Sequence, residues 1–166
     1  MTLEFKRNQE ASRIVGFADS DWAADSEDRK SVSGFIFKVF GNTVSWSSKK
    51  QATVATSSSE AEYVALGAAA TEAIWLNGLL IDLQVEALDP PIIFEDNHGC
   101  IGMAKNLETK RSKHIDVKHH FVRDHIAEGR LKIEAIGTSD QIADLFTKAL
   151  GSTQFQKLRA SLGLTN

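Results

Sequence analysis

The sequence predicts an α/β fold, with a five-stranded mixed sheet that begins with three antiparallel strands and is flanked by helices. Branched and aromatic residues fill short segments in the first third of the chain, as is typical of strands. Apolar residues then recur at helical spacing, and short apolar segments alternate with further helical segments. With 166 residues, 42% of them hydrophobic, the chain is long enough to form a single domain over residues 1–166.

Three strands and a long helix are expected in the first half. The first strand is RIVGFADSDW (13–22), and SGFIFKVFGNTVSWSS (33–48) supplies two more, joined at Gly41-Asn42 in a hairpin turn. The segment SSSEAEYVALGAAATEAIWLNGLLIDL (57–83) has apolar residues on one helical face, and Ser59 is placed to cap its first turn. This segment is the central helix of the predicted fold.

The second half of the chain alternates short strands and helices. After two prolines, IIFED (92–96) is typical of a buried parallel strand, and a helix is expected from about Asn97 to Asn106. KHIDVKHHFVRDHIAEG (113–129) predicts another helix, and RLKIEAI (130–136) predicts the fifth strand. TSDQIADLFTKAL (138–150) predicts a capped helix, after which STQFQKLRASLG (152–163) adds a turn or two.

Composition and charge narrow the functional classes. The single cysteine, Cys100, excludes an internal disulfide and a cysteine-built zinc site, and the net charge of −3 argues against indiscriminate coating of nucleic acid. Residues 105–123 nevertheless hold six basic and two acidic residues, a local charge of +4, which fits either a phosphate contact or a solvated helix face. The longest apolar stretches are interrupted before the roughly 20 residues of a membrane span, so no membrane partner is expected.

Two aspartates stand where predicted strands end. Asp19 lies near the carboxyl end of the first strand, on the same face as Phe17. Asp96 ends the IIFED strand, on the face of Phe94. If these strands are neighbours, the two carboxylates meet at one edge of the sheet, which is where ligands bind in open α/β sheets.

Two more acids belong to predicted helices. Glu62 is on the apolar face of the central helix, so its carboxylate is expected to point toward the sheet. Asp144 lies one turn into the last helix, off its apolar stripe and beside Lys148, so its direction stays open. Gathered carboxylates repel one another unless a cation lies between them, and a hard divalent ion such as Mg²⁺ takes oxygen ligands. The four acids together predict a metal site.

Each acid also has a purely structural interpretation. Glu62 could complete a capping box with Ser59, and Asp96 could cap the following helix. Asp19 could belong to a turn, and Asp144 could be a solvated surface acid.

Five blocks of this sequence resemble one known family. VGFADSDWAAD, SSSEAEYVAL, FEDNHGCIGMAKN, KHIDVKHHFVRD and TSDQIADLFTKAL occur in the same order as in the ribonuclease H domain of copia-type LTR retrotransposon polyproteins, from about Phe5 to Leu150. The resemblance implies a ribonuclease H-like fold. It also implies a metal-dependent endonuclease that hydrolyses the RNA strand of RNA–DNA hybrids during reverse transcription, with two Mg²⁺ ions that Mn²⁺ can replace.

The matching blocks also indicate which residues of this sequence would correspond to the site residues of the family. The catalytic and metal-binding acids would be Asp19 rather than Asp21, Glu62 rather than Glu60, and the acids of the two later blocks, Asp96 and Asp144. Hydroxyl, amide and imidazole groups beside the acids are candidate substrate contacts, namely Ser20, Ser58, Ser59, Asn97 and His98. Candidate phosphate contacts in the basic window are Lys110, Arg111 and Lys113. One departure is that EAIGTSDQ (134–141) lacks the loop histidine of cellular and retroviral relatives.

The expected partners are an RNA–DNA hybrid and the reverse transcriptase of the same polyprotein, in the cytoplasm, within virus-like particles, or in the nucleus. Two alternatives stay open. An integrase-like DNA-processing core would place its glutamate last, whereas Asp144 comes last here. A non-catalytic or domesticated ribonuclease H-like nucleic-acid-binding module would be expected to have lost the acids. A core or strand-flanking position, rather than a base-stacking surface, is expected for Trp22, Trp46 and Trp75.

Overall fold

The computed structural model describes residues 2–6, 14–23, 27–85, 89–105 and 116–165, and its centre is a mixed sheet of five strands in the order β4-β3-β2-β5-β6. β2 (Ile14–Ser20), β3 (Val32–Val39) and β4 (Asn42–Lys50) are antiparallel neighbours. β5 (Ile92–Glu95) runs parallel to β2, and β6 (Lys132–Ala135) runs parallel to β5. The predicted fold class is therefore confirmed.

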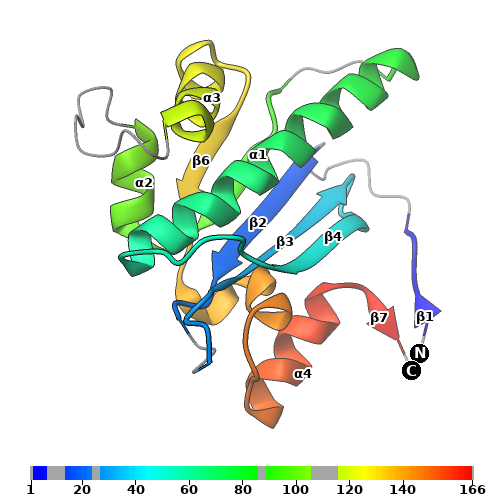
Figure 1. Ribbon diagram of the computed structural model, residues 1–166. Coiled ribbons are helices and arrows are strands. Elements are labelled where there is room, and N and C mark those ends of the chain that lie inside the picture. Colours follow the sequence, from blue (N-terminus) through cyan, green and yellow to red (C-terminus); the bar gives the residue numbers. More distant parts are fainter. Residues whose placement is uncertain (1, 7–13, 24–26, 86–88, 106–115, 166) are drawn as a thin grey trace.

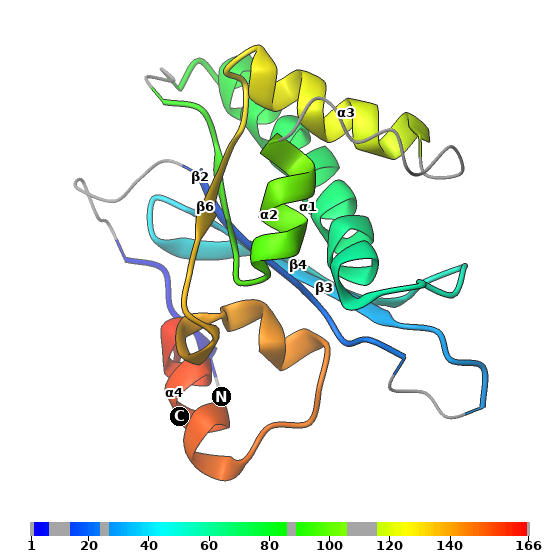
Figure 2. The same ribbon diagram turned by 90° about the vertical axis from the view of Figure 1, so that its left-hand side faces the viewer.

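Helices cover both faces of this sheet (Figures 1 and 2). α1 (Ser58–Asp82), α2 (His98–Lys105) and α3 (Asp116–Ala127) share one hydrophobic core with the sheet. On the opposite face, the 3₁₀ helix η2 (Ile142–Phe146) and α4 (Ser152–Ser161) enclose a second, smaller core around Phe17 and Ile36. Neighbouring residues of one strand therefore belong to different cores, as the alternation of strand side chains requires.

α1 is the core helix. Its sheet-facing side is rich in fully buried alanines, and these small side chains let the helix approach the strands closely. Within the described residues it is also the one helix long and apolar enough to cross a membrane by length and composition alone. Gly67, Glu72 and Gly78 interrupt its apolar residues, as expected from the sequence, and packing against the sheet accounts for its composition.

Two local predictions in the first half were wrong. The residue that caps α1 is Ser57, not Ser59, because the Ser57 side chain accepts a hydrogen bond from the Glu60 backbone N–H. The hairpin between β3 and β4 turns at Phe40-Gly41 rather than Gly41-Asn42. Both turn residues have positive φ, 49° and 79°, as a two-residue hairpin turn of type I′ requires.

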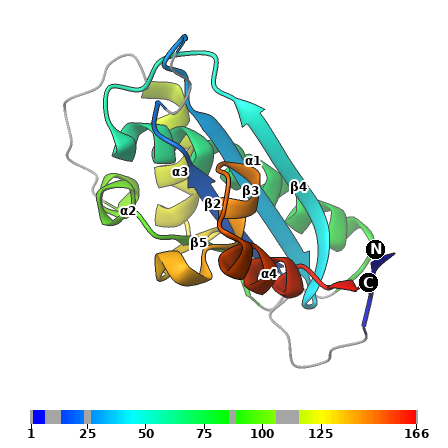
Figure 3. The same cartoon turned by 90° about the horizontal axis from the view of Figure 1, so that it is seen from below.

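The C-terminal segment departs furthest from the prediction. The expected helix over 138–150 is instead two short 3₁₀ helices, η1 (Thr138–Asp140) and η2, and α4 is a separate helix of 10 residues. A further antiparallel pair, β1 (Thr2–Leu3) with β7 (Leu164–Thr165), was not predicted because two-residue strands carry no periodic pattern. Figure 3 shows this pair beside the marked chain ends.

The tryptophans do not lie in the core. Trp22, Trp46 and Trp75 are between 55% and 58% exposed, so the core alternative was wrong. Trp46 lies in β4 and Trp22 comes just after β2, which agrees with the strand-flanking alternative for these two. The indole N–H of Trp22 donates to the Ala55 carbonyl at 3.3 Å, which ties the end of β2 to the loop before α1.

Candidate functional site

Three of the predicted acids converge at one edge of the sheet. β2 and β5 are parallel, with Phe17 opposite Phe94 and the two rings stacked at 5.3 Å between centroids. Asp19 and Asp96 each come two residues later, so both leave the sheet at the same edge. Glu62 reaches this edge from the first turns of α1. One carboxylate oxygen from each of the three acids lies within 4.8 Å of the other two.

The turn and capping hydrogen bonds that Asp19, Glu62 and Asp96 could have accepted are accepted by nearby residues instead. Asp21 accepts a hydrogen bond from the backbone N–H of Val32, and Glu60 accepts one from the backbone N–H of Thr56 at 2.7 Å. The side-chain oxygen of Asn97 accepts from the Cys100 N–H at 2.9 Å and so caps α2 in place of Asp96. The capping interpretations of Glu62 and Asp96 are therefore not those of the structure.

Asp144 also points inward, and only 3% of it is exposed. On an α-helix it would lie off the apolar stripe, but the tighter 3₁₀ turn of η2 directs it toward Asp19. The close packing of η2 on the sheet depends on Gly34, which lies opposite Asp19 in the β2–β3 pair. A Cβ atom on Gly34 would lie 2.6 Å from Cγ2 of Thr147. Because Gly34 has no side chain, η2 can pack closely against β2.

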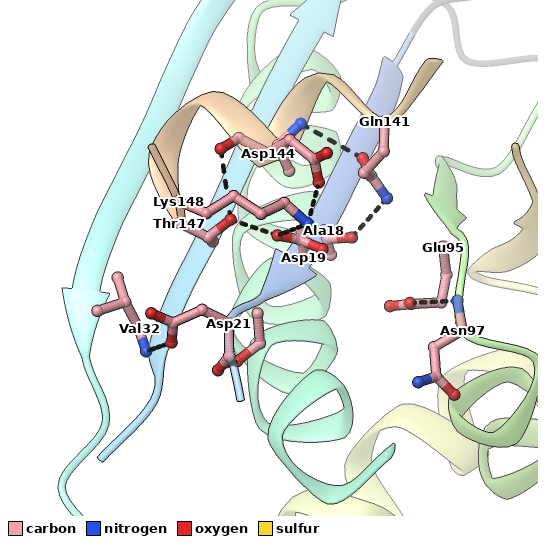
Figure 4. A network of polar contacts seen from close by, with 12 residues as sticks. Ala18, Asp19, Asp21, Val32, Glu95, Asn97, Gln141, Asp144, Thr147 and Lys148 are labelled. Carbon is pink, nitrogen blue, oxygen red and sulfur yellow. Dashed lines mark hydrogen bonds and ion pairs between the residues drawn. The ribbon is translucent and has the colours of Figure 1, made fainter. Parts of the chain in front are cut away.

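Two residues that follow Asp144 contact Asp19 directly (Figure 4). The hydroxyl of Thr147 donates a hydrogen bond to Oδ2 of Asp19. The Nζ atom of Lys148 lies 2.8 Å from Oδ1 of Asp144 and 3.6 Å from Oδ2 of Asp19. Burial lowers the pKa of Lys148, but the hydrogen bond with Asp144 and the charge of Asp19 outweigh it, so the pKa is raised overall. Lys148 is therefore held as a cation between two buried carboxylates.

The remaining electrostatics of the site favour a bound cation. Burial, together with the charges of Glu95 and Asp19, raises the pKa of Glu62 to about 10. Burial also raises the pKa of Asp144 to about 6, although Lys148 opposes the shift, and it raises the pKa of Asp19. No hydrogen bond from a described residue reaches Oε2 of Glu62. A divalent cation between these oxygens would remove both the repulsion and the unmet hydrogen-bonding capacity.

Glu95 is a fifth acid of the site that sequence reasoning missed. It is fully buried, its Oε1 atom accepts from the Asn97 N–H at 3.0 Å, and burial raises its pKa to about 8. A usable signal existed, because strand alternation places Glu95 on the same face as Ile93, toward the core of α1. An acid at a core position is rare enough to mark a site.

The predicted substrate contacts divide into buried and exposed groups. Ser20 is buried, and its hydroxyl donates to the Asp21 carbonyl at 3.0 Å. Ser59 donates to Oδ1 of Asn97 at 3.1 Å, which joins α1 to the start of α2. Ser58 and His98 are exposed beside the acids. The three basic candidates, Lys110, Arg111 and Lys113, lie outside the described residues.

This architecture defines the class: the chain has the ribonuclease H-like fold. The solved structure of LC11-RNase H1 in complex with an RNA/DNA hybrid matches with a TM-score of 0.59 and 16% identity, over 81% of this chain and 94% of that one. The prototype foamy virus protease-reverse transcriptase matches with a TM-score of 0.53 and 14% identity, over 98% of this chain and 22% of that one.

The chain is homologous to the Pol polyproteins of copia-type retrotransposons, as the sequence blocks predicted. It is 38% identical over 153 residues to the retrovirus-related Pol polyprotein of transposon RE1 from Arabidopsis thaliana, which covers 92% of this chain. It is 35% identical over 152 residues to that of transposon TNT 1-94 from Nicotiana tabacum, which covers 91%. The chain spans 10% of the length of the RE1 polyprotein and 11% of that of TNT 1-94. No family model matches the chain.

Proposed function

We propose that this domain is a ribonuclease H, a metal-dependent endonuclease that cleaves the RNA strand of RNA–DNA hybrids during reverse transcription. The observation that carries the proposal is the meeting of Asp19, Glu62 and Asp96 within 4.8 Å at the edge of the sheet. Three buried or half-buried carboxylates so close together weaken the fold of the metal-free protein, so their arrangement needs a functional explanation. The homology to Pol polyproteins supports the same reaction.

The side chains fit a hard divalent ion such as Mg²⁺ or Mn²⁺. Every candidate ligand is a carboxylate oxygen, and Cys100 is buried rather than available as a soft ligand. When bound, such ions activate a water molecule and stabilise the charge that develops on a phosphodiester. Asp19 would hold ions on both of its sides, with Glu62 and Asp96 on one side and Asp144 on the other.

The protein itself supplies position and rigidity. Thr147 holds the Asp19 carboxylate from the η2 side, and the cap of α2 by Asn97 keeps Asp96 free. Exposed Ser58 and His98 stand beside the acids, where they would contact the sugar and phosphate groups of a bound strand. Because the loop histidine of other ribonucleases H is missing, either proton transfer falls to water held at the site or turnover is slower than in those relatives.

The comparisons suggest a partner for the domain. This chain matches 22% of the prototype foamy virus protease-reverse transcriptase, so a reverse transcriptase in the same polyprotein would bring the hybrid to this domain. We propose that it acts in the cytoplasm, within virus-like particles, or in the nucleus.

A cleavage assay tests the proposal. The purified domain is incubated with a labelled RNA–DNA hybrid, duplex DNA or duplex RNA, in Mg²⁺, in Mn²⁺ or in a chelator. We expect cleavage of the RNA strand of the hybrid only, with either metal and not with the chelator, and none by Asp96→Asn. Cleavage of hybrid by Asp96→Asn at the rate of the unaltered protein would refute the proposal, and processing of DNA ends would favour the integrase-like alternative.

A further inference from the structure

The carboxylates around Asp19 form two unequal groups. On one side lie Glu62 and Asp96, whose oxygens and that of Asp19 are within 4.8 Å of one another. On the other side lies Asp144, and here the ammonium group of Lys148 bridges the two aspartates (Figure 4). The first group consists of three carboxylates, which repel one another when ionised. The second already has a counter-ion that belongs to the protein.

We propose that Lys148 is a built-in counter-ion that occupies the position of one divalent ion between Asp19 and Asp144, so that an ion binds there only when the ammonium group moves out. The proposal rests on the proposed metal-dependent function and adds an order of binding to it. The ion held by Asp19, Glu62 and Asp96 binds first, and the ion that needs Asp144 binds second and more weakly.

The distances support mutual exclusion. Nζ of Lys148 is in direct contact with Oδ1 of Asp144 at 2.8 Å and lies 3.6 Å from Oδ2 of Asp19. A Mg²⁺ ion needs carboxylate oxygens at about 2.1 Å, in a nearly ideal octahedron. An ion that used these two oxygens would lie where the ammonium group now lies, and two cations so close would repel each other strongly.

The position of Lys148 in the chain also suits displacement. Its side chain is 38% exposed, whereas those of Asp19 and Asp144 are 2% and 4% exposed. The lysine therefore reaches from the surface to the buried acids with a flexible four-carbon stem and can return to water without disturbing the core. Lys148 lies four residues after Asp144, so the same short segment carries both the acid and its counter-ion.

Calorimetric titration with Mn²⁺ tests this inference on the whole domain. The variant Lys148→Met keeps the apolar length of the side chain and removes its charge. We expect the second ion to bind Lys148→Met about tenfold more tightly than the unaltered protein, while the first ion binds with little change. We also expect a lower melting temperature for Lys148→Met without metal, because Asp19 and Asp144 lose their counter-ion. Lys148→Arg keeps the charge and should keep the weak second ion.

Lys157→Met is the matched control, because Lys157 pairs with exposed Asp140 at 2.7 Å, away from the acids. It removes the same charge and should leave both ions unchanged. Equal or weaker second-ion binding in folded Lys148→Met would overturn the inference. If no protein binds any Mn²⁺, the proposed metal-dependent function fails instead, so the two failures can be told apart.

A measurement on the unaltered protein covers the case in which Lys148→Met does not fold. Lysine acylation followed by mass spectrometry reports how far each amino group is free to react. We expect the labelling of Lys148 to increase with Mn²⁺ over the concentration range of the second ion, and that of Lys157 to stay constant. Labelling of Lys148 that is independent of Mn²⁺, while calorimetry records two ions bound, contradicts the displacement.

Discussion

The hydroxyl of Thr147 donates a hydrogen bond to the Oδ2 atom of Asp19, which lies 128 residues earlier in the chain. This bond joins the end of β2 to the segment that carries Asp144 and Lys148. It is buried at both ends, because Thr147 is 7% exposed and Asp19 is 1% exposed. This buried hydroxyl group therefore helps to fix the geometry of the site on this side.

Replacement of Thr147 by valine is expected to lower the free energy of unfolding. The substitution keeps the shape of the side chain but leaves the buried Asp19 carboxylate without its donor, which typically costs about 1–3 kcal/mol. Thr147→Ser keeps the hydroxyl and should be closer to the unaltered protein. Urea unfolding without metal measures the difference, and equal midpoints for the valine and serine variants would contradict this role of the hydroxyl.

Gly34→Ala is expected to displace η2. The added Cβ would lie 2.6 Å from Cγ2 of Thr147 and 2.9 Å from Cβ of Phe146, so backbone must shift, at a cost of about 1–3 kcal/mol in stability. Gly78→Ala is the matched control, since no heavy atom would lie within 4 Å of its Cβ and helix propensity should add about 0.5–1 kcal/mol. Thermal unfolding should show a lower melting temperature for Gly34→Ala and a higher one for Gly78→Ala than for the unaltered protein.

Glu62→Gln is expected to stabilise the metal-free protein near neutral pH and to abolish cleavage. Burial and neighbouring acids raise the pKa of Glu62 to about 10, so near neutral pH folding must protonate this carboxyl. A neutral amide avoids that cost while it removes a metal ligand. We expect the melting temperature in chelator to rise by roughly 4 °C or more. Glu60→Gln, at the exposed cap of the same helix, should not be more stable and should keep activity. A fall in melting temperature for Glu62→Gln would show that the carboxylate stabilises the fold.

Stability without metal is expected to fall as the pH rises. The pKa values of Glu62 and Glu95 are raised from 4.5 to about 10 and about 8, so the folded protein binds protons more tightly than the unfolded chain. Their contribution is therefore fully present below about pH 4.5 and is lost between that pH and the folded-state values. Melting curves in chelator at about pH 5.5, 7 and 8.5 test this direction. Added Mg²⁺ should reduce the loss, because binding of the ion favours the ionised carboxylates.

Ser57→Ala is expected to destabilise α1 by about 1 kcal/mol, since the Ser57 side chain accepts the Glu60 N–H and caps the helix. Ser58→Ala, one residue later at an exposed helical position, should change stability by less than about 0.5 kcal/mol. Denaturant unfolding separates the two variants. The reverse ranking would place the cap elsewhere.

The strands and the central helix could be predicted because their patterns are local. Phe17 and Asp19 share a face by strand alternation, and Glu62 shares one with the apolar residues of its helix, so three of the four acids could be placed near one edge. Asp144 could not be placed, because its predicted helix is a pair of 3₁₀ turns in the structure. The position of η2 depends on its packing against Gly34, and no periodic sequence pattern marks such a short turn.

The sequence by itself determined the order of the elements from β2 to β6 and the presence of acids at the ends of β2 and β5. Strand alternation and helical spacing can be read from neighbouring residues of the chain. Only the tertiary structure decided which groups share the site. Glu95, Thr147 and Lys148 join Asp19 from distant parts of the chain, and burial together with neighbouring acids raises the pKa of Glu95. Such contacts depend on how distant segments pack, which no short window of sequence contains.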